Sequence, residues 1–213
     1  MTDESQALLL CELARSIFER GLTAGSSGNI SVRRPGGGFL VTPTNASLGR
    51  LAPDRLSRLD ENYEHVAGDR PTKELPLHRA FYETRGPRAQ AVVHLHSPHA
   101  VALSTIEGLD PESVLPPLTP YPIMRLGRVR LLPYVTPGDP EMGRAVERLG
   151  GRAKAVLLAN HGPVTADASL EAAVGAIEEL EAAARLVFLL GSRRARCLGG
   201  DQIAALEARF PID

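Results

Sequence analysis

The stretch Ala91-Val92-Val93-His94-Leu95-His96-Ser97 constrains the fold of this chain more than any other. It is a short apolar run rich in β-branched residues, which is typical of a buried strand. Because side chains alternate between the two faces of a strand, His94 and His96 should point to one side and Val93 and Leu95 to the other. Two imidazoles on one buried face are either hydrogen-bonded core histidines or ligands of a divalent metal ion. Both interpretations are open at this point.

The composition is that of an ordinary globular protein. The 213 residues are 43% hydrophobic and 23% charged, which suits a single domain over residues 1–213 with a proper core. The net charge of -1 provides no overall basic field for nucleic acid or an anionic membrane surface. We therefore expect neither as a partner, and any phosphate on a ligand must be held by local groups.

Cysteine usage and the N-terminus indicate the compartment. Cys11 and Cys197 are far apart and form no C-x-x-C pair, which argues against a disulfide framework and a thiolate zinc site. Residues 1–6 are acidic and polar, unlike a signal peptide, and no apolar run approaches the length of a membrane span. The expected location is the cytoplasm.

Periodicity and chain-breaking residues predict an α/β fold with a mostly antiparallel or mixed sheet flanked by helices. The predicted helices cover about 5–20, 72–85, 98–106, 139–149, 169–190 and 202–209, with a single helical turn at 52–56. The predicted strands cover about 30–34, 39–42, 57–60, 91–97, 129–135, 155–159 and 163–166. The proline-rich segment 115–122 is interpreted as a shaped rigid loop.

A metal-ligand set can be gathered from three places in the chain. His94 and His96 come from one strand end and His161 from the end of another. A catalytic zinc ion takes nitrogen and oxygen ligands and keeps a position for substrate. Glu74, at the start of a predicted helix, is a natural fourth ligand or base. His78, one turn later, either orients Glu74 or only packs against the sheet.

Polar groups beside this set predict a phosphate site. Thr72 and Lys73 would lie at the same helix N-terminus as Glu74, where free N–H groups, the helix dipole, a hydroxyl and an ammonium favour an anion. Two further loops, 28–31 and 42–45, offer amide and hydroxyl donors. Either loop taken singly is better explained as an ordinary turn.

The order of these motifs resembles the class II aldolase family, which includes fuculose-phosphate aldolase and ribulose-phosphate epimerase. The matching pieces cover nearly the whole chain: Gly28-Asn29-Ile30-Ser31, Thr42-Pro43-Thr44, Thr72-Lys73-Glu74 with His78, His94-Leu95-His96, and Asn160-His161-Gly162. Within the family, residues 42–51, 72–74 and 116–121 most resemble the members that decarboxylate 3-oxo-tetronate 4-phosphates.

The resemblance implies a fold, a site and an assembly. The fold would be the family's α/β/α layered domain around a mostly antiparallel sheet, assembled as a homotetramer with sites near subunit interfaces. The metal ion, zinc with manganese or cobalt as alternatives, would be held by His94, His96, His161 and Glu74. Phosphate contacts would come from Asn29, Thr44, Asn45, Thr72 and Lys73. Glu74 would also act as a catalytic base, and Tyr121 would be the proton donor.

Two positions depart from the aldolase pattern. Sugar-phosphate aldolases often have glycine where Asn45 stands, but asparagine tolerates a left-handed backbone better than most residues. They also carry paired serines where Thr72 and Lys73 stand, and the lysine favours a substrate with additional negative charge.

Three hypotheses follow for function. The first is a zinc-dependent carbon–carbon lyase that decarboxylates 3-oxo-tetronate 4-phosphate to dihydroxyacetone phosphate and carbon dioxide through a zinc-stabilised enediolate. The second is an aldolase that runs a retro-aldol reaction on a ketose phosphate such as fuculose 1-phosphate. The third is a non-catalytic binding module like the adducin head, which would predict loss of the metal ligands. A dehydratase acting on a methylthio-sugar phosphate is a further possibility within the family.

Overall fold

A sheet of eight strands forms the centre of the structure, a computed structural model that describes residues 2–212. The order across the sheet is β4-β3-β2-β1-β5-β8-β7-β6. The strands are β1 (Asn29–Arg33), β2 (Phe39–Val41), β3 (Ser57–Leu59), β4 (His65–Ala67), β5 (Ala91–His94), β6 (Arg130–Leu132), β7 (Ala155–Leu158) and β8 (Gly162–Asp167).

The α/β class is confirmed, and the sheet is mixed. β6 pairs with β7 in the parallel sense, whereas the other neighbouring pairs are antiparallel. The prediction of a mostly antiparallel sheet was therefore incomplete. The physical reason is the long connection through α5, which lets the chain return in the same direction and pair β7 beside β6.

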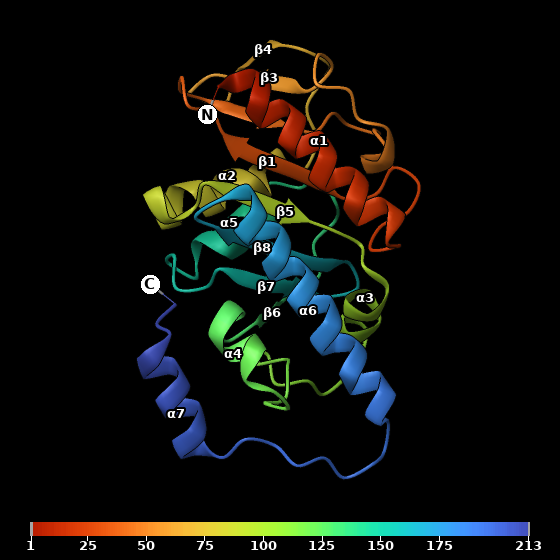
Figure 1. The fold of residues 1–213 in the computed structure, drawn as a ribbon, viewed down its shortest axis with the longest axis vertical. Coiled ribbons are helices and arrows are strands. Elements are labelled where there is room, and N and C mark those ends of the chain that lie inside the picture. The colour runs from red at the N-terminus through yellow and green to blue at the C-terminus, as the bar shows by residue number, and fades with distance from the viewer. Residues whose placement is uncertain (1, 213) are drawn as a thin grey trace.

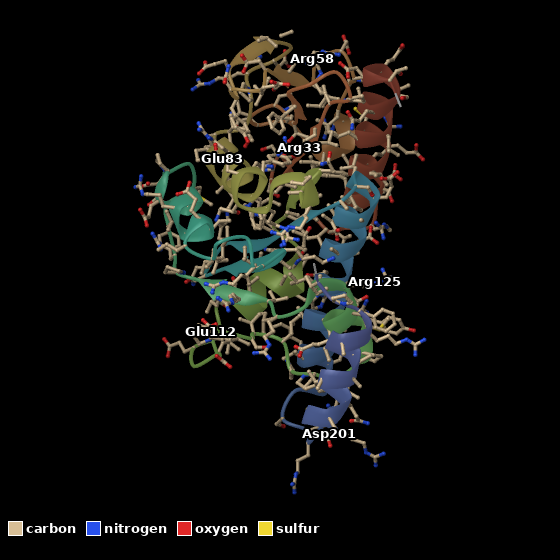
Figure 2. The ribbon with its side chains drawn as sticks, turned by 90° about the vertical axis from the view of Figure 1, so that its left-hand side faces the viewer. Arg33, Arg58, Glu83, Glu112, Arg125 and Asp201 are labelled. Atoms are coloured by element: carbon tan, nitrogen blue, oxygen red, sulfur yellow. The ribbon has the colours of Figure 1, made fainter. Side chains whose placement is uncertain are left out.

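Helices cover both faces of the sheet. They are α1 (Asp3–Glu19), α2 (Leu75–Arg85), α3 (Pro98–Ser104), α4 (Pro120–Leu126), α5 (Glu141–Glu147), α6 (Leu170–Leu190) and α7 (Gly200–Arg209). Figure 1 shows α1 and α6 crossing the near face, and their apolar residues share a core with strands β1 and β5. α2 and α5 share a separate core with the other face. Figure 2 shows the elongated shape, with Arg58 of β3 near one end and Asp201 of α7 at the other.

The central strand alternates as predicted. Val93 and Leu95 belong to the core beneath α1 and α6, whereas Val92 belongs to the core beneath α2. His94 and Val92 lie two positions apart in β5, so His94 faces α2, the helix that begins beside Glu74. The predicted start of this helix is confirmed, because Glu74 is its N-cap residue and Pro76 stands in its first turn.

Three segments differ from the sequence-based expectation. Residues 120–126 form helix α4 inside the segment that was predicted to be a loop. Its prolines, Pro120 and Pro122, stand in the first turn, where missing N–H groups cost nothing. β4 was missed because its three residues are all exposed and show no apolar alternation. Residues 53–55 form one hydrogen-bonded turn, closed from the Arg55 N–H to the Ala52 carbonyl oxygen, which is shorter than the helical turn predicted over 52–56. Among the described helices, none combines the length and the apolar character that a membrane span requires.

The close approach of the start of β8 to the residues after β5, its antiparallel neighbour, requires a glycine at position 162. A Cβ atom there would lie 2.4 Å from the Leu95 carbonyl oxygen, and the residue has a φ of +154°. We predict that Gly162→Ala lowers the free energy of unfolding by at least about 2 kcal/mol, measured by chemical denaturation. Gly36→Ala is the matched control, because a Cβ at Gly36 would meet nothing within 4 Å. Equal stability of the two variants would contradict the proposed backbone contact.

Candidate active site

Three histidines from two separate strand ends meet at one point. His94 ends β5, His96 follows it by two residues, and His161 lies in the turn between β7 and β8. One ring nitrogen from each lies within 4.8 Å of the others, and the Nε2 atoms of His94 and His161 are 3.3 Å apart. β5 and β8 are adjacent strands of the sheet, so their pairing brings these distant segments together.

The local backbone explains how His161 is presented. The turn before β8 closes with a hydrogen bond from the His161 N–H to the Leu158 carbonyl oxygen, and Asn160 adopts a φ of +55° within it. Asparagine accepts this left-handed conformation more readily than most residues. The same hairpin places the Pro163 carbonyl oxygen beside His94, which donates to it from Nδ1 (2.9 Å).

All three imidazoles are held in the neutral form. Burial lowers the pKa of His94 to about 3, and it also lowers the pKa values of His96 and His161. Because His94 carries its proton on Nδ1, the lone pair of its Nε2 faces the other two rings. Neutral imidazoles oriented by a hydrogen bond from the other ring nitrogen are the form that binds metal ions.

The donor set fits a divalent metal ion. The Nε2 atom of His96 is buried and has no hydrogen-bond partner among the described residues. A tetrahedral zinc ion about 2.0–2.1 Å from each ligand nitrogen would hold two such nitrogens roughly 3.3 Å apart. The His94–His161 separation of 3.3 Å matches this value. Hydrogen bonds among the rings leave His96 unsatisfied, and a cation would satisfy it.

The Glu74 carboxylate lies against this cluster. Its Oε2 is 3.5 Å from His94 Nε2, and its Oε1 is 3.4 Å from His161 Nε2. Burial alone would raise the pKa of the Glu74 carboxyl group, but the adjoining imidazoles and an N–H from Asn29 outweigh burial and hold the pKa below its ordinary value. Glu74 is therefore ionised at neutral pH, as a ligand or a base must be.

A chain of buried hydrogen bonds fixes Glu74 from behind. Tyr82 Oη and Ser31 Oγ lie 2.7 Å apart, and Ser31 Oγ lies 2.7 Å from His78 Nδ1. His78 Nε2 is 2.5 Å from Asn29 Oδ1, and Asn29 Nδ2 donates to Glu74 Oε2 at 2.7 Å. Burial lowers the pKa of His78 to about 4, so the ring is neutral and donates in one direction only, toward Asn29. We call these four residues behind Glu74 the Asn29 relay.

The relay was only partly visible in the sequence. Of its four members, Asn29 was predicted as a phosphate contact and His78 as an orienting or packing residue, but Ser31 and Tyr82 were given no role in the site. The sequence spacing of Ser31 and Tyr82 from the other two members could have revealed them. Asn29 and Ser31 are two apart on β1, and His78 and Tyr82 are four apart on α2, so each pair shares one face of its element.

A cleft of about 290 Å³ opens beside the histidines. The residues predicted to bind phosphate and the metal line it together: Asn29, Thr44, Asn45, Thr72, Lys73, Glu74, His96 and His161. Ser26, Ser27 and Pro137 also line it, and sequence reasoning did not select them. Asn45 adopts a φ of +59°, so the left-handed backbone anticipated at this position is present. The cleft thus has imidazoles and a carboxylate on one wall and hydroxyl, amide and ammonium groups on the other.

Tyr121 lies outside this cleft. It stands near the start of α4, is 54% exposed, and does not line the cleft of its own chain. His99 is also apart from the cluster, because its ring and its backbone N–H both bond to the buried Glu181 carboxylate. His65 lies in the exposed strand β4. The structure therefore gathers every predicted site residue except Tyr121.

The chain is similar to a known protein family in sequence and to solved structures in fold. The family model described as "Class II Aldolase and Adducin N-terminal domain" matches residues 9–188. The chain is 46% identical over 199 residues to the 3-oxo-tetronate 4-phosphate decarboxylase of Escherichia coli O6:H1, covering 93% of each protein. It is 34% identical over 184 residues to the L-fuculose phosphate aldolase of the same organism, covering 82% of each. The crystal structure of YgbL from Klebsiella pneumoniae superposes with a TM-score of 0.93 at 44% identity, covering 97% of this chain and 99% of that one.

Because burial lowers the pKa of His78, this residue makes the free energy of unfolding depend on pH. Its pKa of about 4 in the folded protein lies below the ordinary value of about 6.5, so the unfolded chain binds more protons between these values. The contribution is complete above pH 6.5 and is lost as the pH falls toward 4.

We predict that His78→Gln reduces the loss of unfolding free energy between pH 7 and pH 4 by on the order of 3 kcal/mol relative to the unmodified protein. The measurement is urea denaturation across this range in the presence of a chelator. His65→Gln, at an exposed histidine of β4, is the control. Parallel pH profiles for the unmodified protein and His78→Gln would refute the assignment.

Proposed function

The chain belongs to the class II aldolase and adducin N-terminal domain family, and from this premise we propose that it is a metal-dependent lyase that decarboxylates a 3-oxo-tetronate 4-phosphate to dihydroxyacetone phosphate and carbon dioxide. One observation carries the proposal. His96, His161 and the Glu74 carboxylate border the same cleft as Lys73, Thr72 and the 44–45 loop, and the buried His94 lies directly behind His161. A metal-ligand set and a set of phosphate donors therefore face one small substrate.

His94, His96 and His161 would hold the metal ion, with Glu74 as a fourth ligand or as a base beside it. A divalent ion at this position supplies Lewis-acid stabilisation for negative charge that develops on substrate oxygens. We propose zinc, with manganese or cobalt as alternatives, because a site made of imidazole nitrogens and one carboxylate accepts all three.

The opposite wall would hold the phosphate group. Lys73 provides a charge, Thr72 and Thr44 provide hydroxyl groups, and Asn45 provides an amide, all at the N-terminal end of α2 or in the facing turn. Asn29 has one amide N–H committed to Glu74 and its carbonyl oxygen committed to His78, which leaves the second N–H for substrate. Its main role in this proposal is therefore to orient Glu74.

Loss of carbon dioxide from a 3-oxo acid breaks the bond to the carboxylate carbon and leaves an electron pair on the neighbouring carbon. A proton must then reach that carbon. Glu74, ionised and fixed by the Asn29 relay, would handle the proton of the substrate hydroxyl. Tyr121 would deliver the final proton, and since it lies outside the cleft of its own chain, it would have to come from a neighbouring subunit. A homotetramer with sites near its interfaces meets this requirement.

Aldol cleavage of a ketose phosphate is the second candidate, supported by the similarity to L-fuculose phosphate aldolase. Lys73 argues against it, since the aldolases of the family often carry paired serines at 72 and 73. A non-catalytic adducin-like module is disfavoured because the histidine cluster is intact. We also propose a cytoplasmic location, which is consistent with Cys11 and Cys197 being free thiols.

Glu74→Gln tests the reaction. The variant keeps the size of the side chain but removes the charge, so we expect the release of carbon dioxide from 3-oxo-tetronate 4-phosphate to fall at least about a hundredfold. The melting temperature should remain close to that of the unmodified protein. Glu83→Gln, an exposed change on the same helix, should retain full activity. An active Glu74→Gln enzyme would remove Glu74 from the role, and aldehyde release from fuculose 1-phosphate without carbon dioxide release would favour the aldolase.

Metal analysis tests the ligand set. We predict about one divalent ion per chain in the unmodified protein and less than about a tenth of that in His94→Ala, His96→Ala or His161→Ala. Chelation should lower the melting temperature of the unmodified protein but not of these variants, because an ion that binds only the folded state stabilises it. His65→Ala is the control for the loss of one imidazole. Full metal content in any of the three variants would exclude that residue as a ligand.

A further inference from the structure

A second pocket, larger than the cleft, lies on the other side of the 43–45 loop. Its volume is about 480 Å³, and Pro43, Thr44 and Asn45 line both spaces. The rest of its wall comes from Ala46, Ser47, Arg50, Leu51, Ala52, Arg55, Asp69 and Arg70. We call it the arginine pocket. None of the reaction steps proposed above uses it.

The charge of the arginine pocket is strongly unbalanced. Three guanidinium groups line it, those of Arg50, Arg55 and Arg70, against one carboxylate, Asp69. Asp69 is already paired with Arg55, at 2.6 Å from Arg55 Nη2 and 2.8 Å from Arg55 Nε. Within the described residues 2–212, neither Arg50 nor Arg70 makes an ion pair. Both side chains are exposed, so the pocket presents two positive charges to solvent with no carboxylate partner among the described residues.

The backbone holds these two arginines against the phosphate wall of the cleft. The Thr44 N–H donates to the Arg70 carbonyl oxygen, and the Arg50 N–H donates to the Ser47 carbonyl oxygen. Asn45, between them, completes a turn closed by a hydrogen bond from the Ala46 N–H to the Pro43 carbonyl oxygen. Thr44 and Asn45 therefore line both spaces, whereas Arg50 and Arg70 line only the arginine pocket beside them.

We propose that the arginine pocket is a second anion subsite, and that it takes the phosphate group of a small phosphorylated molecule. Two guanidinium groups match the charge of a phosphate dianion, and the planar fork of arginine matches its oxygens. The proposal extends the proposed function but does not depend on turnover. The phosphate has two possible sources: the substrate on its way to or from the cleft, or a separate phosphate ligand.

Equilibrium dialysis of the metal-free protein against radiolabelled inorganic phosphate tests the subsite. We expect two bound phosphates per chain in the unmodified protein, one in the cleft and one in the arginine pocket. The double variant Arg50→Gln/Arg70→Gln should lose one of them, with affinity reduced about tenfold or more at that site. Lys73→Gln should weaken the other.

A matched control separates a built site from general charge. Arg194→Gln/Arg196→Gln removes the same two charges from the exposed segment between α6 and α7, so both double variants go from a net charge of -1 to -3. The control should bind two phosphates like the unmodified protein. Arg50→Lys/Arg70→Lys, which keeps the charge but loses the fork, should bind more weakly than the unmodified protein. Identical phosphate binding by the glutamine variant and the control would overturn the proposal.

Steady-state kinetics with the phosphorylated 3-oxo acid then identifies the source of the phosphate. A KM about tenfold higher with kcat within about twofold, in Arg50→Gln/Arg70→Gln but not in the control, means that the substrate phosphate visits the pocket. An unchanged KM together with the lost phosphate in dialysis means that a separate phosphate ligand binds there. If no carbon dioxide is released by any variant, the proposed reaction fails while the dialysis result still decides the subsite.

Discussion

Three neutral imidazoles and one carboxylate lie against one another at the edge of the cleft, and the rest of the structure is arranged to hold them there. Burial keeps His94 uncharged, and the Pro163 carbonyl oxygen takes its Nδ1 proton, so its Nε2 lone pair turns toward His161. Such groups do not satisfy one another, and within residues 2–212 His96 Nε2 has no hydrogen-bond partner. A bound cation would satisfy the lone pairs of these ring nitrogens. The cluster is therefore better explained as a set of metal ligands than as a polar core. The pairing of β5 with β8 is what makes the cluster possible, and Gly162 permits the close approach.

The carboxylate needs as much positioning as the imidazoles. Glu74 stands at the N-cap of α2, where its side chain makes no capping hydrogen bond and is therefore free to face the histidines. The Asn29 relay then fixes it from the opposite side. Because the ionised Glu74 carboxylate can only accept hydrogen bonds, Asn29 must turn its N–H toward Glu74, and its carbonyl oxygen then accepts from His78 Nε2. The hydrogen bond from Asn29 helps to hold the pKa of the Glu74 carboxyl group below its ordinary value, and the neutral His78 ring supports Asn29 from behind.

Much of this arrangement could be predicted from the sequence, for identifiable reasons. The strand alternation at His94 and His96, the start of α2 near Glu74 and the left-handed Asn45 are local properties, and the structure bears them out. The α4 helix was hidden by prolines that are harmless in a first turn, and β4 lacks any apolar pattern. The hydrogen-bond partners of Asn29 and the residues around Arg50 and Arg70 depend on which elements pack together. No window of sequence contains that information, although the two-residue and four-residue spacings behind the relay were readable.

The metal-ligand set cannot by itself choose between decarboxylation and aldol cleavage, because both reactions place the same negative charge beside the same cation. Selectivity between the two reactions must then come from the other side chains that line the cleft. A 3-oxo-tetronate 4-phosphate carries a carboxylate in addition to its phosphate, whereas a ketose phosphate carries the phosphate alone. Each extra cation near the cleft therefore favours the acid over the sugar. Lys73 lines the cleft, and Arg50 and Arg70, which make no ion pair among the described residues, line the adjoining arginine pocket. In a chain with a net charge of -1, these three cations in two neighbouring spaces favour the more highly charged substrate.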